Sequence, residues 1–151
     1  MAFRTLIKQD LITFLSQTDK EGALGALLGL LENIVAPADI DVIKEGIAKR
    51  EKLMSTGIGL GIAVPHVRIE GIKEPYIVIG VSKSGISDYD SIDNQPVHIT
   101  VMIIVEKGAH KKYISILSSV VSYLKQTETR EKILNANTVD ELFTLFKEVQ
   151  V

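Results

Sequence analysis

Apolar positions in the first third of the chain recur with the period of an α-helix. Four leucines stand at i, i+3, i+4 and i+7, which predicts a helix with one apolar face: Leu24, Leu27, Leu28 and Leu31. Three glycines interrupt the same segment, at Gly22, Gly25 and Gly29. They either weaken this helix or let a neighbouring element pack closely against it.

A second helix is predicted after Pro37. Asp39 is a suitable cap for its first turn. Its apolar face would consist of Val42, Ile43 and Ile47. We expect this helix to end between Arg50 and Leu53, which would bring Arg50 close to the glycine-rich segment that follows.

Extended structure is predicted in the middle of the chain. Residues 62–64 form a short β-branched run that Pro65 ends, since proline favours extended geometry in its predecessor. Residues 76–81 and 97–105 are almost continuously apolar, as strands buried on both faces are. The segment between them, 82–96, is polar and rich in turn-forming residues.

Helical periodicity returns after the last predicted strand. A third helix is expected over residues 109–125, with Ile114, Leu117, Val121 and Leu124 on its apolar face. The final helix begins with a capping-box pattern at residues 138–141 and would bury Val139, Leu142, Phe143 and Phe146. Helices around a mixed β-sheet predict an α/β sandwich, with residues 1–151 in a single domain.

Composition narrows the class of protein. Hydrophobic residues make up 46% of the chain and charged residues 24%, as in globular domains. Cysteine is absent, and neither a membrane-spanning run nor a signal-peptide pattern occurs, so we expect a cytoplasmic protein without direct membrane insertion. The net charge of −2, with no basic stripe, argues against a nucleic-acid partner.

Residues 50–66 hold the chemistry-bearing side chains. Arg50 offers a fixed fork of donors for phosphate oxygens, and Ser55 and Thr56 add hydroxyl donors. Gly57, Gly59 and Gly61 allow close approach of backbone N–H groups to an anion, and His66 is a neutral base that can attack phosphorus. Each part alone is weak: the glycine spacing fits neither a dinucleotide fingerprint nor a P-loop, and a lone histidine after a strand is more often structural.

Taken together, this string resembles the signature of the type-2 enzyme IIA domains of the bacterial phosphoenolpyruvate-dependent sugar phosphotransferase system, in the fructose, mannitol and nitrogen-regulatory branches. Further segments follow the order of that family: Glu74-Pro75, Asp93-Asn94-Gln95-Pro96-Val97, Ile116-Leu117-Ser118 and Arg130-Glu131-Lys132-Ile133-Leu134. The resemblance covers nearly the whole chain.

The resemblance implies that His66 accepts a phosphoryl group, on its ε nitrogen, from the histidine phosphocarrier protein HPr and passes it to a IIB domain. Arg50 would help to hold the phosphohistidine, and Ser55, Thr56, Gly57, Gly59 and Gly61 would line its pocket. Neither a metal nor an organic cofactor is implied.

Two positions depart from the family pattern. A second histidine usually begins the late helix, and Tyr113 stands at that position here, with His110 three residues earlier. Tyr113 supplies a phenolic donor in its place, or His110 reaches the site from a shifted helix start, or the domain has become a regulator. His110 is equally well explained as a solvated residue. The second departure is Val67, where the family more often has a small residue; its side chain would crowd an approaching partner.

Two other functions compete with a phosphocarrier. In a nitrogen-regulatory-type IIA module, phosphorylation of His66 would switch interactions with target proteins. A metal-dependent hydrolase using His66, His98 and His110 is disfavoured, because these histidines lack metal-ligand spacing and no carboxylate cluster stands beside them. We expect His98 to face the core or the sheet edge, without a chemical role.

Overall fold

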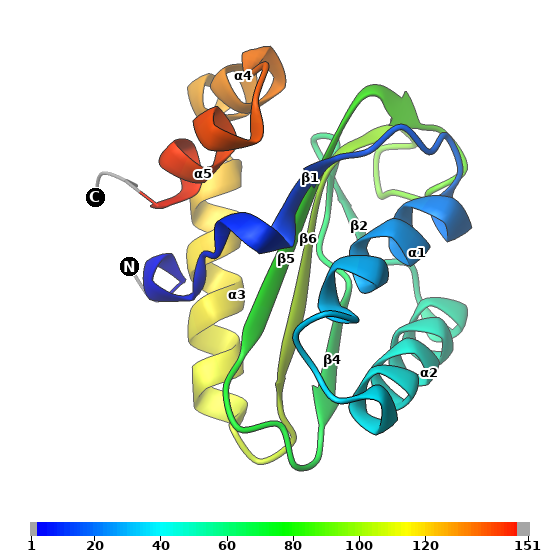
Figure 1. Ribbon diagram of the computed structural model, residues 1–151. Coiled ribbons are helices and arrows are strands. Elements are labelled where there is room, and N and C mark those ends of the chain that lie inside the picture. The colour runs from blue at the N-terminus through cyan, green and yellow to red at the C-terminus, as the bar shows by residue number, and fades with distance from the viewer. Residues whose placement is uncertain (1–2, 148–151) are drawn as a thin grey trace.

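The computed structural model describes residues 3–147, and its elements fall into three successive groups along the chain (Figure 1). The first group holds two 3₁₀ turns, η1 (Arg4–Leu6) and η2 (Gln9–Leu11), strand β1 (Ile12–Phe14) and helices α1 (Lys20–Leu31) and α2 (Pro37–Leu53). The second group holds the strands β2 (Gly57–Gly59), β3 (Ile62–Ala63), β4 (His66–Ile69), β5 (Tyr76–Ile86) and β6 (Val97–Glu106). The third group holds the helices α3 (His110–Leu124), α4 (Thr127–Asn135) and α5 (Val139–Lys147).

The described strands form one mixed sheet. Their order is β1-β5-β6-β3-β2, with β4 also pairing with β6. The long central pair β5–β6 is antiparallel, whereas β1 runs parallel to β5, and both β3 and β4 run parallel to β6. Strands β3 and β4 pair with β6 in one continuous register, so the break between them falls at Val64 and Pro65, immediately before His66.

Helices cover both faces of this sheet (Figure 1). Helices α1 and α2 lie on one side, and α3, α4 and α5 lie on the other. Side chains of β5 and β6 alternate between the two cores, as the pleat requires: Ile77, Ile79 and Ile103 face α3, whereas Val78 and Met102 face α1. The continuous apolar runs of the central strands are therefore explained by burial on both faces.

The predicted α/β sandwich with a mixed sheet is confirmed. The predicted cap of the second helix is wrong: Ala36 is the N-cap residue and Pro37 the first helical residue, which leaves Asp39 inside the first turn. Proline suits that position because its missing N–H would have no partner in the helix.

The predicted apolar face of α3 is displaced by one position for most of its length. The buried residues are Tyr113, Ile116, Val120 and Leu124, while Ile114 remains 47% exposed. Leu117 and Val121 are half-buried at the edge of the core. Both rows have helical spacing, so periodicity alone did not distinguish which of them faces the sheet.

Strand β5 continues to Ile86, so the segment 82–96 is not turn throughout. Strands β1, β2 and β4, which have three or four residues each, were not predicted from the sequence, and neither was α4 as a helix of its own. The predicted cap of the last helix is confirmed for Thr138, since the Glu141 N–H donates to Thr138 Oγ1 at 3.1 Å. The Glu141 carboxylate accepts from the Asn137 N–H, one residue before the position that a capping box uses.

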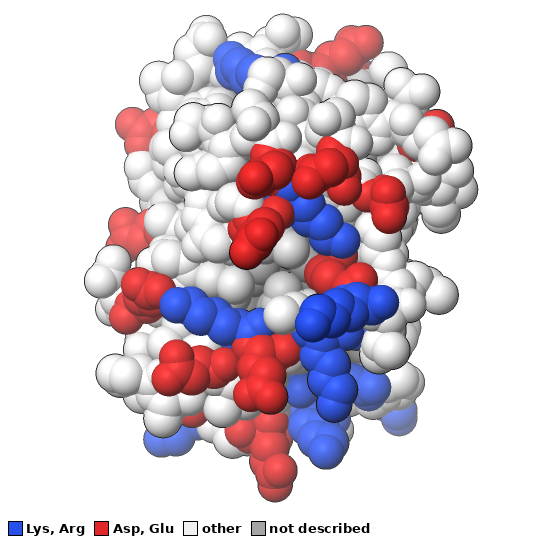
Figure 2. Space-filling view, turned by 90° about the vertical axis from the view of Figure 1, so that its right-hand side faces the viewer, with Lys and Arg blue, Asp and Glu red and all other residues white. Residues whose placement is uncertain are grey.

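The face formed by α1 and α2 carries charged groups of both signs (Figure 2). Lys and Arg side chains gather at the lower right of this view, and acidic side chains lie above and to the left of them. Within residues 3–147, no helix is long and apolar enough to cross a membrane.

Candidate functional site

His66 is the first residue of β4, directly after the break at Val64 and Pro65. The break frees the backbone carbonyl of Val64, which accepts a hydrogen bond from His66 Nδ1 at 2.8 Å. A guanidinium nitrogen of Arg50, in the last turn of α2, lies 3.0 Å from His66 Nε2. Because a guanidinium can only donate, Nε2 is the acceptor and Nδ1 carries the proton.

The surroundings of His66 favour the neutral imidazole. Burial is the main cause that lowers its pKa below the ordinary value, and the positive charges of Arg50 and Arg68 lower it further. The bond to Val64 and the negative charge of Glu51 act in the opposite direction, with less effect. At neutral pH His66 therefore presents an unprotonated Nε2 toward Arg50.

Two hollows adjoin His66 and Arg50. The first, of about 390 Å³, lies between α2, β4 and the start of α3 and is strongly basic. Its lining comprises Gly46, Lys49, Arg50, Leu53, His66, Val67, Arg68, Lys107 and Tyr113. The second, of about 380 Å³, is mostly apolar and reaches toward α3. Its lining comprises Arg50, Met54, Ser55, Thr56, Ile58, Val64, His66, Leu117, Val121 and Lys125. His66 thus lies where a basic surface meets an apolar one.

A larger hollow of about 740 Å³ lies between α4 and α5, on residues 128–145. Its lining includes none of the predicted site residues, and its titratable side chains are Glu128, Glu131, Lys132, Asp140 and Glu141. The two hollows at His66 are therefore the candidate site because of the side chains that line them, although the hollow between α4 and α5 is larger.

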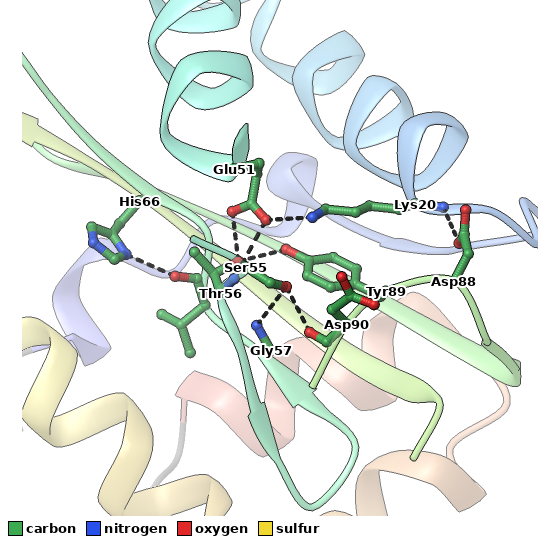
Figure 3. A network of polar contacts seen from close by, with 10 residues as sticks. Lys20, Glu51, Ser55, Thr56, Gly57, His66, Asp88, Tyr89 and Asp90 are labelled. Atoms are coloured by element: carbon green, nitrogen blue, oxygen red, sulfur yellow. Dashed lines mark hydrogen bonds and ion pairs between the residues drawn. The ribbon is translucent and has the colours of Figure 1, made fainter. Parts of the chain in front are cut away.

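The hydroxyl groups of Ser55 and Thr56 have other partners than the histidine (Figure 3). Ser55 Oγ donates to the carbonyl of Asp90 at 2.6 Å. Thr56 is buried, and its Oγ1 lies 2.7 Å from a carboxylate oxygen of Glu51 and 2.6 Å from the hydroxyl of Tyr89. Both residues line the apolar hollow, but neither hydroxyl is directed at His66.

The predicted glycines shape a hairpin and lie outside the lining of both hollows. A Cβ on Gly57 would lie 2.3 Å from the backbone oxygen of Asp90, so the close approach of two loops requires glycine. Gly59 and Gly61 have φ of 92° and 75° and form the left-handed turn between β2 and β3. The Gly59 N–H donates to Ser91 Oγ, and the N–H of the following leucine to Asp93, so these donors are already occupied.

In the folded chain Tyr113 lies beside His66, whereas His110 contacts Arg68 instead. The Tyr113 ring centroid lies 5.3 Å from that of His66, and the side chain is 9% exposed. Burial raises the pKa of its hydroxyl, so Tyr113 stays a neutral donor at physiological pH. His110 is exposed at the start of α3, where its Nδ1 lies 3.5 Å from an Arg68 nitrogen.

The two remaining predicted positions have packing roles. Val67 is half-buried against α2, and a Cβ on Gly46 would lie 2.6 Å from its side chain. His98 is half-buried in β6 and donates from Nδ1 to the carbonyl of Ser82 at 2.8 Å. In residues 3–147, no group of three or more histidine and acidic side chains is arranged to hold a metal ion.

Three of the cations that surround His66 were not predicted from the sequence. Lys49 precedes Arg50 on α2, Arg68 follows His66 by two positions on β4, and Lys107 follows β6. Had His66 been recognised as the start of a strand, the period of two would have placed Arg68 on its face of the sheet. No pattern in the sequence indicated that Lys107 would lie near His66, because only the pairing of β6 with β4 brings the two residues together.

The fold and the site together define an α/β sandwich domain that presents one neutral histidine beside an arginine at the junction of a basic and an apolar hollow. The chain belongs to the family described as "Phosphoenolpyruvate-dependent sugar phosphotransferase system, EIIA 2", whose model matches residues 5–149.

Relatives carry two kinds of name. The chain is 32% identical to the "PTS system fructose-specific EIIABC component" of Bacillus subtilis, over 95% of this chain but only 22% of that longer protein. It is 31% identical to the "PTS system fructose-specific EIIA component" of Haloferax volcanii, over 86% of this chain and 84% of the relative. It is 28% identical to the "Nitrogen regulatory protein" of Pseudomonas aeruginosa, over 87% and 84%.

Solved structures share the fold. The nitrogen regulatory protein IIA-Ntr of Neisseria meningitidis superposes with a TM-score of 0.85 at 23% identity, over 97% of this chain and 99% of that one. The complex of enzyme IIAMTL with phosphorylated enzyme IIBMTL of Escherichia coli gives 0.73 at 21% identity, over 93% and 96%. In that complex, an enzyme IIA domain of this fold is bound to its phosphorylated IIB domain.

Proposed function

We propose that this domain is a phosphocarrier that accepts a phosphoryl group from HPr on His66 and passes it to a sugar-specific IIB domain. The observation that carries the proposal is the arrangement of the imidazole: Nδ1 is tied to Val64, and Nε2 faces Arg50. Family membership and the lowered pKa of His66 support it. No cofactor is part of the proposal.

In the proposed step, the lone pair of His66 Nε2 attacks the phosphorus of the donor phosphohistidine. The new N–P bond forms as the donor's N–P bond breaks, and that electron pair returns to the donor imidazole. The His66 Nδ1–H would stay hydrogen-bonded to the Val64 carbonyl, so the ring would be held in place throughout. Arg50 would shift its donor from Nε2 to the phosphoryl oxygens, whose negative charge it stabilises.

Both hollows fit the docking of such partners. Leu53 and Met54 are 76% and 77% exposed beside His66 and would provide apolar contacts. Lys49, Arg68 and Lys107 would attract the phosphorylated donor. Ser55 and Thr56 would form part of the pocket wall, and their hydroxyls would not bind the phosphoryl group, since they have other partners. Gly57, Gly59 and Gly61 would shape the adjoining hairpin.

The deciding experiment is phosphoenolpyruvate-driven labelling by enzyme I and HPr, followed by intact mass. We expect a gain of one phosphoryl group that is lost in His66→Ala, with the fold retained because His66 is only half-buried. Arg50→Ala should slow labelling by about tenfold or more, since a charge-assisted hydrogen bond is removed. His98→Asn serves as a matched control with the same loss of an imidazole. Labelling that persists in His66→Ala would refute the proposal.

A regulatory role is the second candidate, because Tyr113 occupies the position beside His66 where the family usually has a histidine. In this alternative the domain is phosphorylated on His66, and the added dianion favours or prevents binding of a target protein. Normal labelling by HPr, without onward transfer to any IIB domain tested, would favour it over sugar uptake.

A further inference from the structure

The residue next to Arg50 is a buried carboxylate. The Glu51 side chain is only 7% exposed, at the end of α2. Its Oε1 lies 2.8 Å from Lys20 Nζ, and its Oε2 accepts a hydrogen bond from Thr56 Oγ1 at 2.7 Å (Figure 3). The Thr56 N–H also donates to Oε1, at 3.4 Å. Both carboxylate oxygens of Glu51 therefore already have partners.

Lys20 is itself held in place. It is the first residue of α1, and its backbone N–H donates to Asp88 at 2.7 Å. Its Nζ lies 4.6 Å from the centre of the Tyr89 ring, whose hydroxyl is bonded to Thr56. The network thus joins the start of α1, the end of α2, the start of the glycine hairpin and the loop at residues 88–90 (Figure 3).

This network matters for Arg50 because a guanidinium beside a free carboxylate would pair with it. Bidentate pairing of arginine with a carboxylate is among the strongest polar contacts in proteins. With Glu51 neutralised by Lys20, Arg50 instead donates to His66 Nε2 at 3.0 Å. A buried carboxylate that lost Lys20 would need another cation, and Arg50 is adjacent in the chain.

We propose that Lys20 is a positioning residue: by occupying Glu51, it keeps the Arg50 guanidinium directed at His66. The inference rests on the proposed function for its kinetic consequence, but the contact between Arg50 and His66 can be tested without any phosphoryl transfer. The charged and titratable groups around His66 come from every element packed against it: Lys49, Arg50 and Glu51 from α2, Arg68 from β4, Lys107 after β6, and Tyr113 and Lys125 from α3 and the residue that follows it.

The test compares Lys20→Met, Lys20→Arg and the double variant Lys20→Met/Glu51→Gln. Lys44→Met is the matched control. Lys44 also lies on a helix and forms an ion pair of similar length, with Glu32 at 2.7 Å, but this pair is exposed to solvent. Two quantities are measured for each: the pKa of His66 by NMR titration, and the rate of phosphoryl acceptance from HPr.

In Lys20→Met we expect the pKa of His66 to rise, because Glu51 is no longer neutralised and Arg50 is drawn away from the imidazole. Acceptance should slow by about tenfold or more. Lys20→Arg, which keeps the charge, and the double variant, which removes the competing carboxylate, should both return the pKa and the rate toward wild type. Lys44→Met should change neither.

A purely structural ion pair would give a different result. Lys20→Met would then lower the melting temperature while the pKa of His66 stayed at the wild-type value, and the double variant would recover no activity. That outcome overturns the inference. If wild-type protein accepts no phosphate, the proposed function fails, yet the pKa comparison still decides whether Lys20 positions Arg50. If Lys20→Met does not fold, Lys20→Gln, which also removes the positive charge but keeps a polar side chain, provides the same comparison, with the same expected rise in the pKa of His66.

Discussion

At the scale of the residue, the backbone rather than a second side chain orients the reactive imidazole. The Val64 carbonyl fixes His66 Nδ1, so Nε2 is left for Arg50. A carbonyl cannot be titrated, and the tautomer is therefore independent of pH as long as the ring is neutral. Burial, the hydrogen bond to Val64 and the neighbouring charges together set the pKa of His66, and so how much neutral imidazole is present.

The role of Tyr113 is testable at the same scale. If its hydroxyl donates to the phosphoryl group, Tyr113→Phe should slow acceptance by about tenfold or more, because a hydrogen bond to a charged group is lost while the ring is kept. Tyr113→His should restore the rate if the imidazole is the better donor. Single-turnover labelling measures both.

Tyr123→Phe is the control for this pair of variants. Tyr123 lies at the end of α3, and its hydroxyl donates to the Leu145 carbonyl of α5, so its removal should leave the labelling rate unchanged. Equal rates for wild type and Tyr113→Phe would show that Tyr113 contributes packing alone.

At the scale of the element, the site depends on close contacts that only glycine allows, one between two loops and one between a strand and a helix. The β2–β3 hairpin lies against residues 90–93, where Gly57 forms a bridge to Ser91. On the other side of the sheet break, Val67 packs into the space left by Gly46 on α2. These contacts hold the end of α2, and with it Arg50, beside the start of β4.

We expect Gly57→Ala to destabilise the fold by about 1–3 kcal/mol, because the added methyl group would overlap the Asp90 backbone, which has no flexible side chain to yield. Gly25→Ala is the matched substitution in α1, where no atom lies within 4 Å of the added group. It should stabilise the protein by about 0.5–1 kcal/mol through helix propensity. Chemical denaturation measures both, and equal effects would contradict the close approach at Gly57.

At the scale of the whole molecule, one sheet supports two cores. The central strands β5 and β6 contribute side chains to both faces, so neither layer of helices can lose its packing without exposing the sheet. The site lies at the border of the two layers, since Arg50 comes from α2 and Tyr113 from α3.

This architecture predicts one cooperative unfolding transition. Leu27→Ala in the core under α1, and Leu142→Ala in the core under α5, should each lower the free energy of unfolding by about 2–5 kcal/mol, since both residues are fully buried. Far-UV circular dichroism and tyrosine fluorescence should report coincident transitions. Ile92→Ala, at an 81% exposed position, should change stability by about 0.5 kcal/mol or less. Two separated transitions would show that the layers unfold independently.

The sequence was sufficient where its signals were periodic or local. The long buried strands, the first helix, the cap of the last helix and the approach of Arg50 to the glycine-rich segment all followed from residue type and spacing. A role for Arg50 at His66 was implied by the family resemblance. The short strands had too few residues for a period, and α3 carried two apolar rows between which periodicity did not choose.

Residue pattern alone was enough to predict the class of fold and to single out His66 as the candidate site residue, because hydrophobic periodicity and a local motif need no distant partner. How the residues of that motif are arranged is seen in the tertiary structure alone. It turned the hydroxyls of Ser55 and Thr56 toward Asp90 and Glu51, occupied the hairpin N–H groups, and assembled Arg68, Lys107 and Tyr113 around His66. These outcomes depend on pairings between residues far apart in the chain, and no local pattern encodes such pairings.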